Sequence, residues 1–283
     1  MERDIENQYL DLLKLVLDNG IIKSNRTGTN TITSIPTMIQ HDMDKGFPLL
    51  TTKHMGIKSV SAELEFFIKG LSDKQWLKDR NCNIWSEWCN PSKIPDGLSD
   101  GDRKKFQLLE NDLGKVYGYQ WRNFNSEGHD QFKSIVDCLK NDVDNRRMVC
   151  SAWNPLEFEE MALPPCHVMW GVQVLGGRLN VWWMQRSVDL FLGLPYNLAS
   201  YALLLKLLAK QSGLKEGILT GFLSDVHIYD NHINQVKEQL TRTPYKLPSL
   251  DIPKFTNIYE WEYTDVSLIN YTSHPSIKAP IAI

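Results

Sequence analysis

The sequence has few of the features that mark membrane, exported or nucleic-acid-binding proteins. No stretch approaches the roughly 18 consecutive apolar residues of a membrane-spanning helix. The initial segment MERDIENQYL has acidic residues where an export signal has an apolar run. A formal net charge of -3 gives no basic excess of the kind that sequence-independent binding of DNA or RNA requires. We therefore expect a cytoplasmic protein that contacts neither membranes nor nucleic acid, although a small phosphate-bearing ligand would need only a few well-placed arginines.

Cysteine is also scarce. The five cysteines, Cys82, Cys89, Cys138, Cys150 and Cys166, are odd in number, widely scattered and without a C-x-x-C pair. This spacing indicates neither a disulfide framework nor a zinc site, and it is typical of a reducing compartment. We expect no bound metal.

Apolar residues, by contrast, are plentiful. They make up 42% of the chain and include 9 Trp, 10 Tyr and 10 Phe, which is ample for a substantial core. Helical spacing of apolar residues over 5–19 and 57–69, each followed by glycine, predicts two helices. Asp130 is placed to cap a third helix, and residues 198–211 are apolar nearly all round, which is typical of a buried helix.

Segments rich in β-forming residues complete the pattern. Residues 29–40 predict one strand, and 148–153, 167–175 and 179–184 predict three strands of one sheet. This mixture predicts an α/β or α+β layered fold, with a large mixed sheet covered by helices. Residues 89–112 combine prolines, glycines and charges without sustained periodicity, so we expect a surface insertion within a single domain spanning 1–283.

Cys166 lies in the segment ALPPCHV, after two prolines and just before a predicted strand, where its position is held rigidly. A thiolate is a strong nucleophile, and a neighbouring cation increases the fraction of thiol that is ionised. An isolated cysteine is more often a buried structural residue. Its interpretation therefore depends on the motifs that accompany it.

Many short motifs accompany Cys166 in order along nearly the whole chain. They are NRTGT (25–29), GFPLLTTK (46–53), ELEFFIKG (63–70), NIWSEW (83–88), VYGYQWR (116–122), DNRRMVCSAWN (144–154), QRSVD (185–189), LGLPYN (192–197), SDVHIYDNH (224–232) and KAPIAI (278–283). Each motif alone would be weak evidence for any family, but together they closely resemble the motifs of the thymidylate synthase family.

This resemblance implies a reaction and a quaternary structure. Cys166 would attack C6 of the uracil ring of dUMP, which makes C5 a carbon nucleophile. C5 would capture the methylene group of the co-substrate 5,10-methylenetetrahydrofolate, and hydride from the folate would complete the methyl group, giving dTMP and dihydrofolate. The resemblance also implies a homodimer in which one face of the sheet forms the interface.

The resemblance assigns the nucleotide phosphate to a cluster of cations. Arg26 and Arg186 would come from one subunit and Arg146 and Arg147 from the other, with help from the Ser187 hydroxyl. A dianion suits such a clamp, because the guanidinium group offers several fixed N–H donors. Outside this context, an Arg-Arg pair is ordinarily a solvated surface patch.

Asn197 would identify the base. A carboxamide can accept from uracil N3–H while it donates to O4, whereas cytosine reverses that pattern. An asparagine in this position is otherwise often a helix cap, and it could serve both purposes. His227 and Tyr229, two apart in a predicted strand, share a face and would bind the deoxyribose 3′-hydroxyl.

Proton transfer around the base is implied for two residues. Glu63 lies in an aromatic-rich helix, where burial would raise its pKa toward neutral, although an isolated helix glutamate is usually solvent-facing. Tyr117 matches a tyrosine near the C5 proton, and His167 would support the site from behind rather than act as the general base.

The folate site is implied as a set of flat apolar walls with a polar anchor. Asp189 would hydrogen-bond the pterin beside the substrate, Lys53 would lie near the glutamate tail, and the C-terminal APIAI, including Ala282, would fold over the site. The walls match Ile84, Trp85, Trp88, Leu163, Leu192, Gly193 and Tyr196. Taken alone, a tryptophan-rich stretch is more often plain core.

Several positions depart from the family pattern. Gly171, Val172 and Gln173 replace a Gln-Phe-Tyr run at the expected dimer interface, so we expect that interface to be repacked. Leu223 and Ser224 precede Asp225 where glycine is usual, which adds a hydroxyl near the cavity. His54 and Gly56 replace basic residues, and Trp182–Trp183 is bulkier than the family pattern.

These departures leave two alternatives open. In the first, water rather than hydride adds to the exocyclic methylene intermediate, so the enzyme is a dUMP hydroxymethylase and Ser224 is a candidate for holding that water. The intact APIAI tail and Trp85 favour hydride. In the second, the chain is an idle family member that binds nucleotide or RNA as a regulator, a role that the complete catalytic set and the absent basic bias disfavour.

Overall fold

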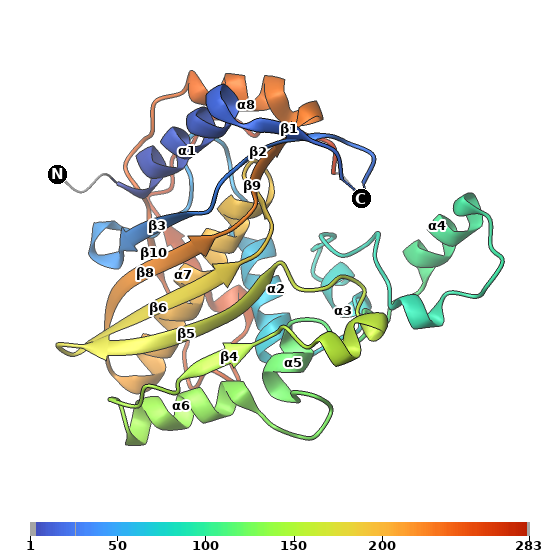
Figure 1. The fold of residues 1–283 in the computed structure, drawn as a ribbon. Coiled ribbons are helices and arrows are strands. Elements are labelled where there is room, and N and C mark those ends of the chain that lie inside the picture. The colour runs from blue at the N-terminus through green and yellow to red at the C-terminus, as the bar shows by residue number, and fades with distance from the viewer. Residues whose placement is uncertain (1–3, 26, 282–283) are drawn as a thin grey trace.

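The fold is described by a computed structural model for residues 4–25 and 27–281 (Figure 1). The α-helices are α1 Ile5–Asn19, α2 Ile57–Ile68, α3 Gln75–Lys78, α4 Asp100–Leu109, α5 Gly118–Arg122, α6 Gln131–Asn141, α7 Gly193–Ser212 and α8 Ile233–Leu240. The strands are β1 Ile21–Lys23, β2 Thr31–Ser34, β3 Thr37–Asp42, β4 Val149–Ser151, β5 His167–Leu175, β6 Arg178–Gln185, β7 Val188–Asp189, β8 Lys215–Leu223, β9 Val226–Tyr229, β10 Ser249–Asp251 and β11 Ser267–Ile269. Short 3-10 turns lie at Met43–Lys45, Pro91–Lys93, Pro155–Glu160, Asp230–His232 and Tyr263–Asp265.

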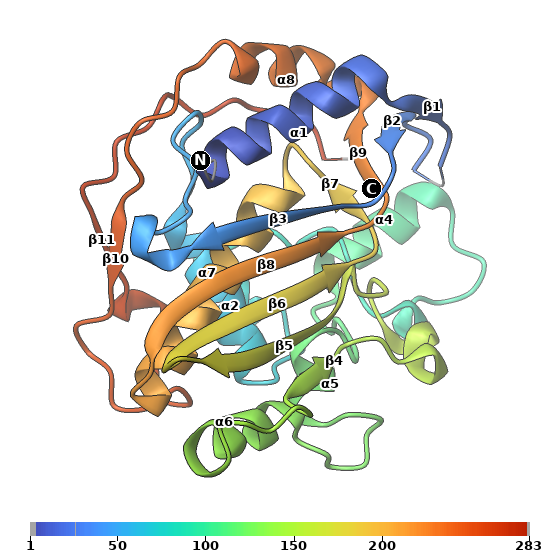
Figure 2. The same ribbon diagram turned by 60° about the vertical axis from the view of Figure 1, so that its left-hand side comes forward.

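Two sheets organise the molecule. The larger has the order β3-β8-β6-β5-β4, antiparallel except for the parallel pair β6 and β8. The smaller has the order β1-β2-β9-β7. Helices α7 and α2 lie behind the larger sheet in Figure 2, and the face toward the viewer carries no helix. The mixed α/β class predicted from the sequence is confirmed, as is the placement of β4, β5 and β6 in one sheet.

Two helices match their predictions closely. Helix α1 spans the predicted residues, with Asp4 accepting at its N-cap from Asn7 N at 3.0 Å. Helix α6 begins after Asp130, whose carboxylate accepts from Lys133 N at 2.8 Å. Its buried side chains are those expected: Phe132, Ile135, Val136 and Leu139. Local apolar periodicity and capping were sufficient in both cases.

The single strand expected over 29–40 is instead two strands in different sheets. Strand β2 pairs with β9 and strand β3 pairs with β8, so the chain leaves one sheet for the other between Ser34 and Thr37. Pro36 lies at this break, where its lack of an N–H and its fixed φ prevent a continuous ladder. The prediction of one continuous strand was wrong for this reason.

Helix α7 begins five residues earlier than expected, at Gly193 rather than at residue 198. Its N-cap is Leu192, so Asn197 lies in the second turn and is not a cap. Pro195 is compatible with the first turn, because the N–H groups there have no partner inside the helix. The side chain of Asn197 is therefore available for another role.

Most of the segment 89–112 is exposed or half-buried, although Cys89 and Asn90 at its start are buried, and it contains helix α4, which its sequence pattern did not predict. Ser99 caps this helix, and Figure 1 shows α4 projecting away from the sheets. The buried Lys74 anchors its base by donating to three backbone carbonyls, those of Ser86 at 2.9 Å, Trp88 at 2.7 Å and Gln107 at 2.6 Å.

Two adjacent tryptophans of β6 fit because glycines lie opposite them. Trp182 pairs with Gly171 of β5, and Trp183 pairs with Gly221 of β8. A Cβ atom added at either glycine would lie 2.5 Å from the facing indole ring. Two departures found in the sequence, Gly171 and the bulky Trp182, therefore explain each other: the missing side chain at Gly171 leaves the space that the Trp182 ring fills.

Candidate active site

Cys166 lies in the loop that ends at the first residue of β5, and its side chain is half-buried. Its backbone is fixed on both sides. Cys166 N donates to Tyr117 Oη at 2.7 Å, and Cys166 O accepts from Arg186 N at 2.8 Å. The loop therefore presents the sulfur from a defined backbone position between β5 and the end of β6.

Arg186 wraps the loop that carries Cys166. Its Nε donates to Pro165 O and its Nη2 to Pro164 O, both at 2.8 Å. The guanidinium carbon also lies 5.4 Å from the centre of the Trp153 ring. Two carbonyls and an aromatic face thus hold a permanent positive charge against the two residues that precede Cys166. The two prolines contribute to this arrangement because their carbonyls accept hydrogen bonds from the guanidinium group.

Tyr117 sits in an aromatic cluster behind Cys166. Its ring centre lies 4.2 Å from that of His167 and 5.0 Å from that of Phe67. Burial raises the pKa of the Tyr117 hydroxyl well above its ordinary value, so the phenol is neutral. Its backbone has a φ of 24°, which is strained for a tyrosine and places the ring against the Cys166 loop.

His167 is buried beside this cluster and pairs with Tyr201 Oη through Nδ1 at 2.9 Å. Burial lowers the pKa of His167 to about 3. The imidazole is therefore neutral and only weakly basic at physiological pH, and its role behind the site stays a prediction.

Glu63 projects from α2 toward Trp85, whose indole Nε1 donates to Glu63 Oε1 at 2.8 Å. Removal from water by the surrounding side chains raises the pKa of Glu63 to about 7, and the Trp85 hydrogen bond opposes part of that rise. A carboxyl group with such a pKa can gain or lose a proton at neutral pH.

Asn197 is held by a neighbouring carboxamide. Gln185 Nε2 donates to Asn197 Oδ1 and to Ser187 O, both at 3.1 Å. Gln185 Oε1 in turn accepts from Trp183 Nε1 at 3.1 Å. Gln185 belongs to the motif QRSVD, but no role was expected for it. The alternation of β6, which puts residues 183 and 185 on one face, was the signal that could have revealed it.

Strands β7 and β9 bring Asp189 beside His227, which is its partner in the parallel ladder. Asp189 Oδ1 accepts from Phe191 N at 2.9 Å and from Leu192 N at 3.1 Å. The rings of His227 and Tyr229 have centres 5.1 Å apart, so they share a face of β9 as predicted. His227 Nδ1 lies 2.8 Å from the Asp225 carbonyl, which fixes the ring.

The residues proposed to line the folate site lie at the edge of the core. Trp85 and Trp88 meet edge to face, with ring centres 6.1 Å apart. Several further members of the set are partly buried hydrophobic residues packed against the core: Ile84, Leu163, Leu192 and Tyr196. Gly193, at the start of α7, is half-buried.

Lys53, the predicted partner of the folate tail, is buried. Its ammonium donates to the Phe191 carbonyl and lies 3.8 Å from the centre of the Phe191 ring. Burial lowers the pKa of Lys53 to about 7. The structure thus places Lys53 against Phe191, just before the start of α7. The contact of Lys53 with folate stays a prediction.

Not every predicted residue is gathered around Cys166. Arg26 and Ala282 lie outside the described residues. Arg146 and Arg147 are exposed and precede β4, in which Val149 pairs with Gly171. Gly171 is five residues along β5 from the cysteine, or about 16 Å at strand spacing. Both arginines lie beyond that point.

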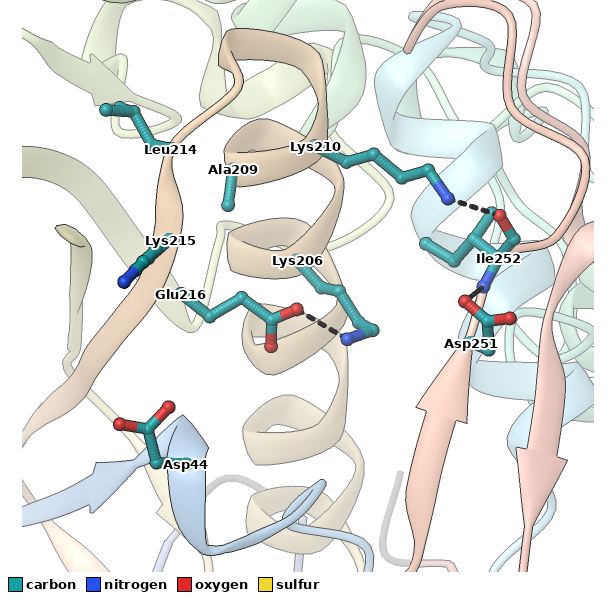
Figure 3. Close-up of a pocket in the computed structure, with 9 residues that line it drawn as sticks. All are labelled: Asp44, Lys206, Ala209, Lys210, Leu214, Lys215, Glu216, Asp251 and Ile252. Atoms are coloured by element: carbon teal, nitrogen blue, oxygen red, sulfur yellow. Dashed lines mark hydrogen bonds and ion pairs between the residues drawn. The ribbon is translucent and has the colours of Figure 1, made fainter. Parts of the chain in front are cut away.

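A separate hollow of about 480 Å³ lies elsewhere on the surface (Figure 3). Its cations are partly neutralised: Lys206 pairs with Glu216, and Lys210 donates to the Ile252 carbonyl. Lys210 follows Asn197 by 13 residues on α7, or about 20 Å of helix. This hollow is therefore not part of the site around Cys166.

Among the described residues, no group of three or more His, Cys, Asp or Glu side chains could hold a metal ion. None of the helices in that part of the chain has the length and apolar content needed to cross a bilayer.

A comparison with protein families identifies the family of the chain. The family model described as thymidylate synthase matches residues 7–283, which is nearly the whole chain. Members of this family transfer a one-carbon unit from methylenetetrahydrofolate to dUMP. Because this model covers nearly the whole chain, the chain belongs to the thymidylate synthase family.

Proposed function

We propose that the protein is a thymidylate synthase, which converts dUMP and 5,10-methylenetetrahydrofolate to dTMP and dihydrofolate through a covalent bond between Cys166 and C6 of the base. The observation that carries the proposal is the Arg186 clamp on Pro164 and Pro165, because it holds a cation against the loop from which Cys166 would attack, and a nearby cation would favour the thiolate. We further propose that residues 1–283 form one catalytic domain, since buried apolar residues from Ile5 to Trp261 belong to one cluster.

Each step of this proposal has a residue suited to it. Attack by the Cys166 thiolate on C6 develops negative charge on the uracil ring at O4, and a donor from Asn197 would stabilise it. Glu63, with a pKa of about 7, would exchange protons around the base. Tyr117, whose oxygen holds the Cys166 backbone, would lie near the C5 proton.

The folate would fit against the aromatic wall. Trp85 and Trp88 offer flat faces, and the Trp85 ring is fixed by its bond to Glu63. Asp189 would accept from the pterin, because a carboxylate can use its second oxygen while Oδ1 holds the backbone of residues 191 and 192. No metal is required by this scheme.

A homodimer is part of the proposal. The exposed Arg146 and Arg147 precede β4 and lie too far from Cys166 to reach the site of their own chain, so a second chain would have to supply them. The uncovered face of the larger sheet offers the surface for it. This face carries exposed apolar side chains, Met38 at 50%, Met184 at 45% and Phe222 at 44%, which would be buried between two copies.

One observation favours a second candidate, a dUMP hydroxymethylase. Ser224, which stands where the family usually has glycine, is half-buried and its N donates to Gln185 O at 2.8 Å. This places a hydroxyl-bearing residue next to the strand end that supports Asn197. A water held there would compete with hydride for the exocyclic methylene group.

The experiment that separates the two is a product analysis. The enzyme is incubated with dUMP and methylenetetrahydrofolate while dihydrofolate absorbance and the mass of the nucleotide product are followed. Dihydrofolate with a methyl product identifies a synthase, and tetrahydrofolate with a hydroxymethyl product identifies a hydroxymethylase. Nucleotide binding without turnover would contradict both.

A further inference from the structure

The residues behind Asn197 form a relay of hydrogen bonds with a fixed direction. Trp183 Nε1 donates to Gln185 Oε1, and Gln185 Nε2 donates to Asn197 Oδ1, each over 3.1 Å. An indole N–H is only a donor, so the atom of Gln185 that faces it must be the oxygen. The nitrogen of Gln185 then faces Asn197, and the atom of Asn197 that receives it must be the oxygen.

The direction of the Asn197 carboxamide matters because this group has nearly the same shape after a 180° turn. In one orientation its outer edge donates where uracil has O4 and accepts where uracil has N3–H. In the other it donates to N3 of cytosine and accepts from the cytosine amino group. An asparagine that turned freely would fit either base, so discrimination requires that the turn be prevented.

We propose that Trp183 is a positioning residue for base selectivity: its indole N–H fixes the direction of Gln185, and through it the direction of Asn197 that excludes dCMP. This inference rests on the proposed role of Asn197 in binding the uracil of dUMP. It assigns a purpose to a tryptophan that departs from the family pattern.

The surroundings of Trp183 are built to hold the indole in one place. The residue is fully buried, and its ring is stacked on Tyr201 with centres 5.1 Å apart and planes 9° apart. Gly221, its partner across the ladder, leaves the space that the ring fills. Gln185 is 2% exposed, so water has little access to replace a lost hydrogen bond.

A second contact also fixes the direction of the Gln185 carboxamide, so this direction does not depend on Trp183 alone. Gln185 Nε2 also donates to Ser187 O, an acceptor that favours the same direction. Loss of the indole N–H should therefore weaken the preference rather than abolish it. A neutral hydrogen bond of ordinary strength biases such a turn by about fivefold to tenfold.

The test compares binding of dUMP and dCMP to the full-length protein by titration calorimetry. In Trp183→Phe, which keeps the ring but removes the donor, the ratio of dissociation constants for dCMP and dUMP should fall by about fivefold or more. Trp182→Phe is the matched control, because the neighbouring indole packs beside Phe222 on the opposite face of β6. It should leave the ratio unchanged.

A third variant reverses the relay without touching Trp183. Gln185→Glu has acceptors at both ends, so Asn197 must turn its Nδ2 toward residue 185 and present the cytosine-type edge to the base. Its selectivity should then be insensitive to a further Trp183→Phe change, because the relay no longer depends on the indole. Additive effects of the two changes would overturn the inference.

The outcomes separate this inference from the proposed function. An unchanged ratio in Trp183→Phe, with wild-type protein that binds and turns over dUMP, overturns the role of Trp183 alone. Wild-type protein that binds dCMP as well as dUMP overturns the selectivity on which the inference rests, whereas failure to turn over dUMP overturns the proposed function. A Trp183→Phe protein with reduced stability still gives a valid ratio, because both nucleotides are titrated into the same folded sample.

Discussion

Glu63 and Trp85 are joined by a hydrogen bond of 2.8 Å from the indole Nε1 to a carboxylate oxygen, across 22 positions of sequence. This bond lowers the pKa of a carboxyl group that burial raises to about 7. Because Trp85 is also a proposed wall of the folate site, we expect occupation of that site to change the protonation state of Glu63 through this indole N–H.

Replacing Glu63 with glutamine should lower kcat by about 10²-fold or more, because the rate contribution of a general acid–base group is of that order. The wild-type dependence of kcat/KM on pH should show an ionisation near pH 7 that is absent from Glu63→Gln. Trp85→Phe removes the bond that stabilises the carboxylate, so its ionisation should move to higher pH. An unchanged pH profile in both variants would contradict the assignment.

The same group predicts a pH dependence of stability. The Glu63 carboxyl ionises near 4.5 when unfolded and near 7 when folded, so the folded protein binds more protons between these values. The contribution of Glu63 to the free energy of unfolding is therefore present below pH 4.5 and is lost as the pH rises through 7. Denaturant unfolding at pH 5 and pH 7.5 should show a smaller difference for Glu63→Gln than for wild type.

Cys166→Ser should abolish turnover, by about 10³-fold or more, while dUMP binding is largely retained, because the serine hydroxyl is a much weaker nucleophile. Mass spectrometry with a fluorinated dUMP and methylenetetrahydrofolate should detect a covalent adduct in wild type only. Cys138→Ser is the control, since Cys138 is also half-buried but lies in α6. An adduct that persists in Cys166→Ser would show that Cys166 is not the nucleophile.

Asn197→Asp should shift the preference from dUMP toward dCMP, by about 10²-fold in the ratio of kcat/KM values, since a site that cannot satisfy a polar edge rejects that substrate strongly. The aspartate loses the donor to O4 and gains an acceptor for the cytosine amino group. Steady-state rates with each nucleotide measure the ratio. Unchanged base selectivity would show that the base is recognised elsewhere.

Lys74→Met should destabilise the protein by about 2–4 kcal/mol, because three partly buried carbonyls lose a charged donor. Denaturant unfolding measures the loss, and hydrogen exchange should show faster exchange in α4, since one of the carbonyls belongs to Gln107. Lys104→Met, at an exposed position of the same helix, should change stability by less than about 0.5 kcal/mol. If Lys74→Met and Lys104→Met changed the stability equally, Lys74 would not be the anchor of α4.

A variant with both Arg146→Ala and Arg147→Ala should be inactive, and so should Cys166→Ser. Mixing equal amounts and allowing subunits to exchange should restore about a quarter of wild-type activity, because half of the dimers are mixed and each mixed dimer has one complete site. No recovery, with exchange verified by tagged subunits, would show that the arginines serve their own chain or none.

The sequence predicted those elements whose causes are local. Asp130 and the apolar spacing after it defined α6, because capping and periodicity operate within one or two turns. The break at Pro36 was missed because which sheet each half joins depends on β8 and β9, almost 200 residues away. Gln185 and Trp183 share a face by alternation alone, but their contact with Asn197 depends on how α7 packs against β6. No pattern in a single segment contains that information.

The matched pairs of tryptophan and glycine have an evolutionary consequence. Any lineage in which Gly221 acquired a side chain would have to displace the Trp183 ring, and a smaller residue at 183 would leave a void beside Tyr201. Neither exchange is neutral by itself, so the two positions should change together or not at all. In relatives of this protein, tryptophan at one site and glycine at the other should therefore be inherited as a unit.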